Sequence, residues 1–583
     1  MSERVGRWTR FARWAPFTIA VLAIASSLNG ITNRFTYDDR YIVELNPAMK
    51  DIAHWWRSFA TSYWPKSWGG DGYRPLTILM FKIETWIGHG STVPFHATNI
   101  LLYAIASVLV LLLARRLLPP WAAWLAAALF AVHPVHVEAV ANVVGQSELL
   151  VAVALLSAVT VYLRDRQNGT LTFRTGAIIA LCYAVGCLAK EHAIVLPALL
   201  GVAELTVIDD GRSIRERLGD RRIRILYLSL VAVAVAFVSA RSLVLADHGL
   251  GGFQPFTPFS ALKIGTFDRI LTAIGVVPEW IRLLLWPARL SSEYGPPDIP
   301  IAQGVAVWQV PGFLLLFAVL AICVVVRRRQ PVISFGIAVL CVALLPSSNF
   351  VIPAGIVLAE RTLFLPSVGA MLAVGGIAVV VAKELTARFG DRAVIQRVSM
   401  AAIALVLAAG VTRSVLRTRV WKDNTTLFYQ AVVDSPDSYR AHYMLGAYQF
   451  EQKQNRVGEL SYRKALNLFP YDPYLSYNLA EQYRKFGLCN EAIPLYRWTF
   501  GLNPTFSMGH SAFTACLLEA GQYAEAKRMA FEVIRGGGEV RRAHRLIFLA
   551  DSAMAAEGSR RSAPTVATAG SPSKVPQTVQ KTP

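Results

Sequence analysis

The chain has 583 residues, of which 54% are hydrophobic and only 16% are charged. This composition excludes a single soluble domain and favours a protein with many membrane spans. A formal net charge of +20 would suggest nucleic acid as the partner of a soluble protein. Here the Lys and Arg residues fall mainly in short loops between apolar runs, a pattern that sets membrane topology, so we expect no nucleic-acid partner.

The N-terminal segment has a cluster of basic residues, from Arg4 to Arg13, before its first apolar run. The end of this run lacks a small-x-small cleavage site, which predicts an uncleaved span. Because basic residues stay in the cytoplasm, the following loop, residues 32–95, is predicted to face the outside. Apolar runs recur along the chain and predict about eleven transmembrane helices, near residues 14–31, 97–118, 121–135, 146–163, 175–190, 193–208, 225–246, 309–326, 332–347, 362–382 and 398–412.

The outer loop is rich in aromatic residues, including Trp55 and Trp56, which favour an amphipathic helix at the membrane interface; a simple anchoring loop is the alternative. Near residues 266–288, charged side chains such as Asp268 and Arg282 would each cost about 2.5–3.5 kcal/mol at a lipid-exposed bilayer centre. We therefore predict a membrane-associated hairpin there rather than a span. This assignment leaves every basic loop in the cytoplasm and the C-terminal part outside.

Beyond the last apolar run the composition becomes that of a soluble domain. Pro436, Pro470 and Pro504 are spaced 34 residues apart, the period of tetratricopeptide repeats, and we predict an α-solenoid of such repeats at residues 419–540. A tail at residues 556–583, rich in Ser, Thr, Pro and Ala, is predicted to be disordered. The six cysteines show neither CxxC nor Cys/His spacing, so we expect neither a zinc site nor a disulfide framework.

Ionisable side chains gather at the predicted outer ends of the spans. Asp38 and Asp39 directly follow the first span; in isolation, such a pair is more often a solvated loop end. Ionisable groups at a membrane edge indicate a functional site when several converge on one face. Carboxylates beside cations fit displacement at a sugar carbon, because a carboxylate takes the proton of the attacking hydroxyl and cations stabilise a leaving phosphate.

Short polar motifs mark these span ends: Phe-x-Tyr-Asp-Asp at 35–39, Tyr-Arg-Pro-Leu at 73–76, Phe-His-x-x-Asn at 95–99, His-Pro-Val-His-x-Glu at 133–138, Ala-Lys-Glu at 189–191, Leu-Pro-Ser-Ser-Asn at 345–349 and Ala-Glu-Arg-Thr at 359–362. Through these motifs the chain resembles the transmembrane and tetratricopeptide-repeat-containing O-mannosyltransferases. The resemblance covers about residues 14–540. The resemblance implies an all-α, polytopic GT-C fold in residues 1–418. It implies transfer of mannose from a polyprenyl phosphate to Ser or Thr hydroxyls of proteins.

Carried over by position, the resemblance implies that Asp38 and Asp39 are the catalytic pair, with Asp38 favoured as the base, Asp39 orienting the acceptor, and the order of the two left open. It implies donor-phosphate contacts from Arg74, Lys190 and Arg361. The sugar and acceptor pocket is expected to be lined by His96, Asn99, His133, His136, Glu138, Glu191 and Glu360. Gln146 stands where the family commonly has Arg, so it cannot supply that charge.

We therefore predict an inverting glycosyltransferase that uses a lipid-linked sugar as co-substrate, with exported proteins held by the repeats. Two carboxylates could bind a hard cation, but no carboxylate-rich spacing requires a metal. The expected location is a bacterial inner membrane with the repeats in the periplasm, or the endoplasmic reticulum membrane with the repeats in the lumen. The alternatives are a transferase acting on a glycolipid or cell-wall glycan, and a non-enzymatic membrane scaffold that carries repeats.

Overall fold

A computed structural model describes residues 2–66, 71–245, 257–389, 392–504, 506, 508–535 and 540–562. Regular structure in these residues is helical, and the β contacts among them are isolated bridges that join Tyr294 to Leu358 and Pro297 to Ser438. The predicted all-α class is therefore confirmed for the described residues. The chain divides into two compact units, Met1–Tyr471 and Asp472–Pro583.

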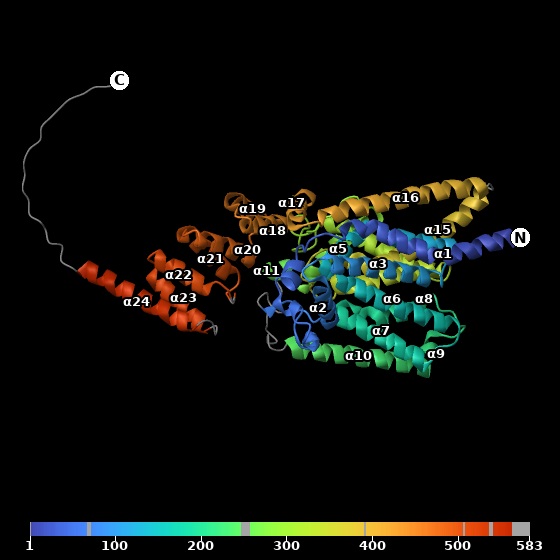
Figure 1. The fold of residues 1–583 in the computed structure, drawn as a ribbon, viewed down its shortest axis with the longest axis horizontal. Helices are drawn as coiled ribbons and strands as arrows, with labels where there is room; N and C mark the ends of the chain where they lie inside the picture. The colour runs from blue at the N-terminus through green and yellow to red at the C-terminus, as the bar shows by residue number, and fades with distance from the viewer. Residues whose placement is uncertain are drawn as a thin grey trace, which may run out of the picture. The chain divides into compact units, whose positions relative to one another are not determined.

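The first unit is built on long apolar helices. Its α-helices are α1 (Ser2–Ser27), α2 (Pro75–Gly88), α3 (Val93–Ala114), α4 (Pro120–Ala131), α5 (Val137–Ala141), α6 (Gln146–Gln167), α7 (Phe173–Ala189), α8 (Leu196–Thr206), α9 (Ile214–Gly219), α10 (Arg221–Leu245), α11 (Pro258–Ala261), α12 (Thr266–Leu285), α13 (Val310–Val326), α14 (Pro331–Leu344), α15 (Phe364–Phe389), α16 (Arg392–Val420), α17 (Asn424–Asp434), α18 (Tyr439–Glu451) and α19 (Asn455–Leu468). Helices α10, α7, α6, α3, α1 and α16 lie side by side in that order (Figure 1).

Six of the described helices are long and apolar enough to cross a membrane, or seven if α4 and the bent continuation Pro134–Ala141 form one span. Large apolar side chains are exposed along several of them; Phe317 of α13 is 74% exposed and Leu405 of α16 is 72% exposed. Such faces are explained by contact with lipid. The chain is therefore a multi-pass membrane protein. Each of the eleven predicted segments lies mainly on a helix, but the full count of eleven spans stays a prediction.

The predicted hairpin near residues 266–288 is wrong. The segment is one continuous helix, α12, with Pro278 inside it. Its charged side chains have partners within the protein: Arg282 pairs with Glu279, and Asp268 accepts a hydrogen bond from a backbone N–H at 2.8 Å. The charges argued against a span, and the structure overturns only the break that a hairpin requires. By length and composition α12 is not among the candidate spans.

The predicted boundary after residue 418 also differs from the structure. Helix α16 runs through it to Val420, and α17 to α19 belong to the first unit. The reason is packing against the membrane part: the N–H of Tyr37 donates to Asn424 Oδ1 at 2.9 Å, and Pro297 pairs with Ser438. Sequence composition reports solvent exposure and does not report such tertiary contacts.

The second unit consists of paired helices. Helix α20 (Pro473–Lys485) packs against α21 (Cys489–Leu502), α22 (His510–Glu519) against α23 (Tyr523–Arg535), and α23 against α24 (Val540–Ser562). The turns inside the first two pairs contain Gly487 and Gly521, each with a φ of +73° that favours glycine. These glycines lie about one 34-residue tetratricopeptide period apart. The assignment of the pairs to a tetratricopeptide solenoid stays a prediction.

Cys489 in α21 and Cys516 in α22 form a disulfide, with Cα atoms 5.0 Å apart. The expectation that the cysteines form no disulfide is therefore wrong for this pair. The two residues are 27 positions apart in the sequence, and the packing of α21 against α22 brings them together. No short spacing motif could have revealed the pair.

The predicted disordered tail, residues 556–583, starts too early. Helix α24 continues to Ser562. Residues 554–557, Met-Ala-Ala-Glu, are strong helix formers, which explains the longer helix. Residues 563–583 lie outside the described part of the chain.

Candidate functional site

The loop after α1 carries the two adjacent aspartates. Tyr37, directly before them, has a left-handed backbone with a φ of 55°, which is unfavourable for a residue with a side chain. Its N–H donates to Asn424 Oδ1 and its hydroxyl donates to Glu293. These contacts hold a turn that gives Asp38 and Asp39 different surroundings.

Asp39 is fully buried, with 0% of its surface exposed. Its carboxylate accepts backbone N–H hydrogen bonds from Thr36 (3.1 Å), Val143 (3.2 Å) and Val144 (2.8 Å). Close packing of this turn needs Gly145, because a Cβ there would lie 2.2 Å from a carbonyl oxygen of α5. Burial raises the pKa of Asp39 to about 7, although the three N–H donors oppose the shift. Asp39 thus ties the loop after α1 to the turn before α6.

Asp38 is partly exposed, and its carboxylate makes no hydrogen bond to any residue that the structure describes. Burial raises its pKa to about 6, while the positive charges of Arg361 and Arg440 act in the opposite direction. At neutral pH most of this carboxylate is therefore charged. A charged, partly exposed carboxylate can accept a proton from a hydroxyl, whereas Asp39 is fully buried and already accepts three backbone hydrogen bonds.

Arg361 stands at the start of α15, in the short turn Glu360–Leu363. Its backbone N–H donates to Glu138 Oε2 at 2.9 Å, and its guanidinium donates to the other oxygen of Glu138, which is 1% exposed. The side chain of Arg361 is 20% exposed. Glu138 therefore orients a guanidinium that keeps N–H groups available for an anion.

Two further ion pairs join the end of α7 to the starts of α2 and α6. Arg74, the residue before α2, donates from Nε to Glu191 Oε2 at 3.0 Å and lies over the ring of Tyr63, 4.4 Å from its centroid. Lys190, directly after α7, pairs with Glu148 of α6. Burial would raise the pKa of Glu191, but Arg74 and backbone N–H groups lower it to about 2.

The three predicted donor-phosphate cations share one electrostatic environment. Burial lowers the pKa of Lys190, Glu148 raises it, and the positive charges of Arg74 and Arg361 lower it further. Each of the three cations is held by its own carboxylate, in the pairs described above. The three carboxylates balance the three positive charges, so the contact of these cations with a donor phosphate stays a prediction.

Five other predicted pocket residues are buried in the protein and bonded to it. Glu360 accepts from the Ser291 N–H at 2.6 Å and from the Tyr294 hydroxyl at 2.7 Å. The other contacts are His96 with the Asn33 carbonyl, Asn99 with the carbonyls of Val140 and Asn142, His133 with the Leu284 carbonyl, and His136 with the hydroxyls of Tyr103 and Ser367. These hydrogen bonds account for the burial of the five polar side chains. Their role in sugar binding stays a prediction.

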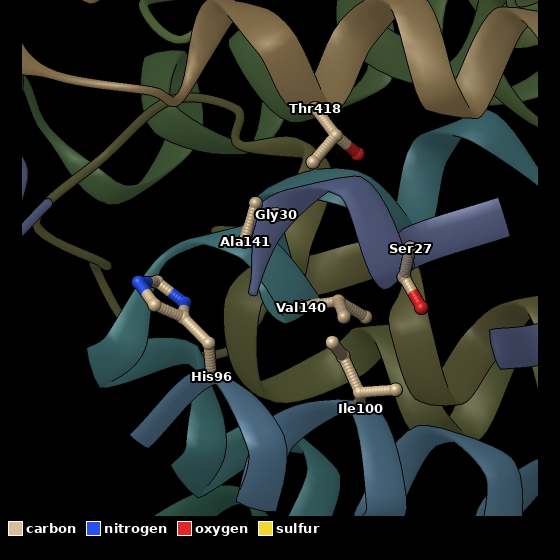
Figure 2. Close-up of a pocket in the computed structure, with 7 residues that line it drawn as sticks. All are labelled: Ser27, Gly30, His96, Ile100, Val140, Ala141 and Thr418. Atoms are coloured by element: carbon tan, nitrogen blue, oxygen red, sulfur yellow. The ribbon is translucent and has the colours of Figure 1, made fainter. Parts of the chain in front are cut away.

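His96 also lines a small cavity with Ser27, Gly30, Ile100, Val140, Ala141 and Thr418 (Figure 2). The cavity has a volume of about 10 Å³. This is room for one water molecule and not for a hexose. Among the described residues, no group of three or more His, Cys, Asp or Glu side chains is arranged to hold a metal ion.

Sequence reasoning assigned no site role to four residues around Asp38 and the cations: Glu148, His192, Glu293 and Arg440. Glu148 and His192 had a signal, because both are polar residues at the ends of apolar segments; His192 Nε2 lies 3.3 Å from Glu148. Glu293 and Arg440 had none, because they reach Asp38 only through tertiary packing. Gln146 is buried and donates to Glu84 at 2.7 Å.

Comparisons with known proteins agree with the motifs. The family model described as dolichyl-phosphate-mannose-protein mannosyltransferase matches residues 74–244. The mouse protein O-mannosyl-transferase TMTC3 is 24% identical over 84% of this chain and 55% of its own length. The human protein O-mannosyl-transferase TMTC4 is 27% identical over 77% of this chain and 65% of its own length. The Drosophila melanogaster protein O-mannosyl-transferase Tmtc2 is 34% identical over 48% of this chain and 30% of its own length.

Fold and comparisons together define a helical, multi-pass membrane protein similar to mannosyltransferases. More particularly, the chain is similar to the TMTC-type protein O-mannosyl-transferases, which confirms the resemblance indicated by the motifs. The chain spans only part of the length of these relatives: 55% of the mouse TMTC3 protein and 65% of the human TMTC4 protein.

Proposed function

We propose that this protein is an inverting glycosyltransferase that moves mannose from a polyprenyl phosphate to Ser or Thr hydroxyls of exported proteins. The observation that carries the proposal is the contrast between the two aspartates. Asp39 is buried and accepts three backbone hydrogen bonds, whereas Asp38 is partly exposed, has no hydrogen bond to its carboxylate from the described residues, and interacts with the charges of Arg361 and Arg440. A general base beside cations is what displacement of a sugar from a phosphate requires.

In the proposed reaction, the acceptor oxygen forms a bond to the anomeric carbon of mannose while the bond from that carbon to the phosphate oxygen breaks. The bonding electron pair leaves with the polyprenyl phosphate, and the hydroxyl proton passes to Asp38. Arg74, Lys190 and Arg361 stabilise the charge that grows on the phosphate. A single displacement from the face opposite the phosphate inverts the configuration at the anomeric carbon.

We infer that the second unit lies outside the cytoplasm, in the periplasm of a bacterium or the lumen of the endoplasmic reticulum. The disulfide between Cys489 and Cys516 supports this side, because structural disulfides persist in oxidising compartments. The distribution of basic loops in the sequence supports the same topology. The paired helices would hold the protein acceptor, as the concave surfaces of helical repeats commonly do.

The rival acceptor is a glycolipid or cell-wall glycan. The helix pairs of the second unit favour a protein acceptor, because stacked helix pairs are suited to binding extended peptides. A non-enzymatic scaffold is disfavoured by the three oriented cations and the available Asp38 carboxylate, since a scaffold has no need for buried, paired charges.

The test supplies purified protein with radiolabelled polyprenyl-phosphate mannose and an extract of exported proteins. We expect the wild type to label protein, and we expect Asp38→Asn to lower the rate of labelling by at least about a hundredfold. Asp209→Asn, a control in an exposed loop, should label protein at the wild-type rate. Label confined to lipid would establish the rival acceptor. Equal labelling by wild type and Asp38→Asn would refute the base. A phosphatase reporter fused to the C-terminus is expected to be active, since such enzymes need an oxidising compartment.

A further inference from the structure

Helix α18, which lies within the predicted repeat region, contributes a charged side chain to the candidate site. Arg440 is the second residue of α18, where a positive charge is disfavoured by the helix dipole. Its Nε donates to Glu293 Oε2 at 3.1 Å, and another of its nitrogens donates to the Tyr37 hydroxyl at 3.3 Å. Glu293, 6% exposed, also accepts from the Tyr37 hydroxyl. Arg440 is therefore tied to the residue next to Asp38.

The segment at residues 291–297, which contains Glu293, is bonded both to the membrane helices and to α18. Toward the membrane helices, the Ser291 N–H donates to Glu360 at 2.6 Å. Toward α18, the Tyr439 N–H donates to the Pro296 carbonyl at 3.2 Å, and Pro297 pairs with Ser438. The segment thus packs between the start of α15 and the start of α18, and it presents Glu293 to Arg440 in a defined position.

We propose that α18 completes the catalytic site, with Arg440 as a positioning residue whose guanidinium, oriented by Glu293 and Tyr37, keeps Asp38 charged and ready to accept the acceptor's proton. This inference rests on the proposed role of Asp38 as the base. It adds a function for the region beyond the membrane helices: besides holding acceptors, this region supplies through α18 a charge without which a smaller fraction of Asp38 is unprotonated at acidic pH.

The electrostatic surroundings of Asp38 make the consequence of losing Arg440 predictable in sign. Arg361 and Arg440 favour the charged carboxylate, whereas Glu293, Glu138 and burial oppose it. Asp39 and the hydroxyls of Tyr37, Tyr41 and Tyr63 also interact with Asp38. Removal of the Arg440 charge leaves Arg361 as the main cation, so the pKa of Asp38 rises from its value of about 6.

The experiment measures kcat and the donor KM for mannose transfer between pH 5 and 9, with the full chain and the variants Arg440→Gln, Arg440→Lys and Arg463→Gln. The first two test the charge and its conservative replacement. Arg463 is the control, since it lies in α19 and pairs with Glu459 at an exposed site. Replacement of Arg440 by Gln leaves the buried carboxylate of Glu293 without its ion-pair partner, so thermal melting of each variant checks that the fold is retained.

We expect Arg440→Gln to move the acid limb of kcat upward by about one pH unit, which lowers the rate about fivefold at pH 6 and leaves it nearly unchanged above pH 8. Arg440→Lys restores the acid limb, and Arg463→Gln leaves it in place. An unmoved limb with a rate that is uniformly lower at every pH would overturn the inference and leave the proposed function standing. Absence of transfer by the wild type at any pH would refute the proposed function and this inference together.

Discussion

Replacement of each aspartate by asparagine should separate chemistry from stability. In Asp39→Asn, one carboxylate oxygen becomes an amide nitrogen that cannot accept, so at least one of the N–H groups of Thr36, Val143 and Val144 loses its partner. A buried donor without a partner costs about 1–3 kcal/mol. In Asp38→Asn no hydrogen bond among the described residues is lost, and the neutral side chain removes the burial penalty of a charge.

The assay is thermal melting in detergent, followed by the fluorescence of the 14 tryptophans, at pH 8, where both carboxylates are charged. We expect Asp39→Asn to melt a few degrees below the wild type and Asp38→Asn to melt at or slightly above it. Activity should show the reverse order, with the larger loss in Asp38→Asn. If Asp38→Asn melted lower than Asp39→Asn, or if both melted like the wild type, the assigned division of roles would be refuted.

Three further predictions concern other parts of the protein. Activity of the wild type should fall as the pH drops through about 6, because Asp38 must be unprotonated to act as a base; a kcat/KM profile that is flat between pH 5 and 8 would contradict this. Glu138→Gln should weaken the orientation of Arg361 and destabilise the fold by up to about 3–5 kcal/mol, seen as a raised donor KM and a lower melting temperature; an unchanged KM would remove Arg361 from the phosphate site. Cys489→Ser should cost the second unit about 2–4 kcal/mol of unfolding free energy, and a reductant should cost the wild type the same; a resistant unit would show that the Cys489–Cys516 bond is unimportant for stability.

The helices of the membrane part could be predicted because their signal is local. Apolar runs of spanning length identify them without knowledge of their neighbours. The segment near residues 266–288 is not a candidate span, as predicted, but it is one helix and not a hairpin, because its path depends on packing against neighbours such as α13. The boundary after residue 418 failed for the same reason, since Asn424 and Ser438 are bound to loops of the membrane part.

The candidate site shows the same limit. Asp38, Arg74, Lys190 and Arg361 could be found because each lies in a recognisable motif at a helix end. Glu138 and Glu191 were predicted as pocket residues and not as partners of these cations, yet the structure pairs Arg361 with Glu138 and Arg74 with Glu191. An ion pair between residues 223 positions apart has no local signature.

The different roles of two adjacent aspartates depend on the backbone of Tyr37. A left-handed conformation costs a residue with a side chain about 1–2 kcal/mol, so it must be held from outside the loop. The partners that hold it, Glu293 and Asn424, come 256 and 387 positions later in the chain. The charge-assisted hydrogen bond to the Glu293 carboxylate and the neutral bond to the Asn424 side chain can together offset that cost. The position of the proposed base therefore depends on the 291–297 segment and on α17 as much as on its own loop, and substitutions at Asn424 should act on Asp38 from the far end of the first unit's sequence.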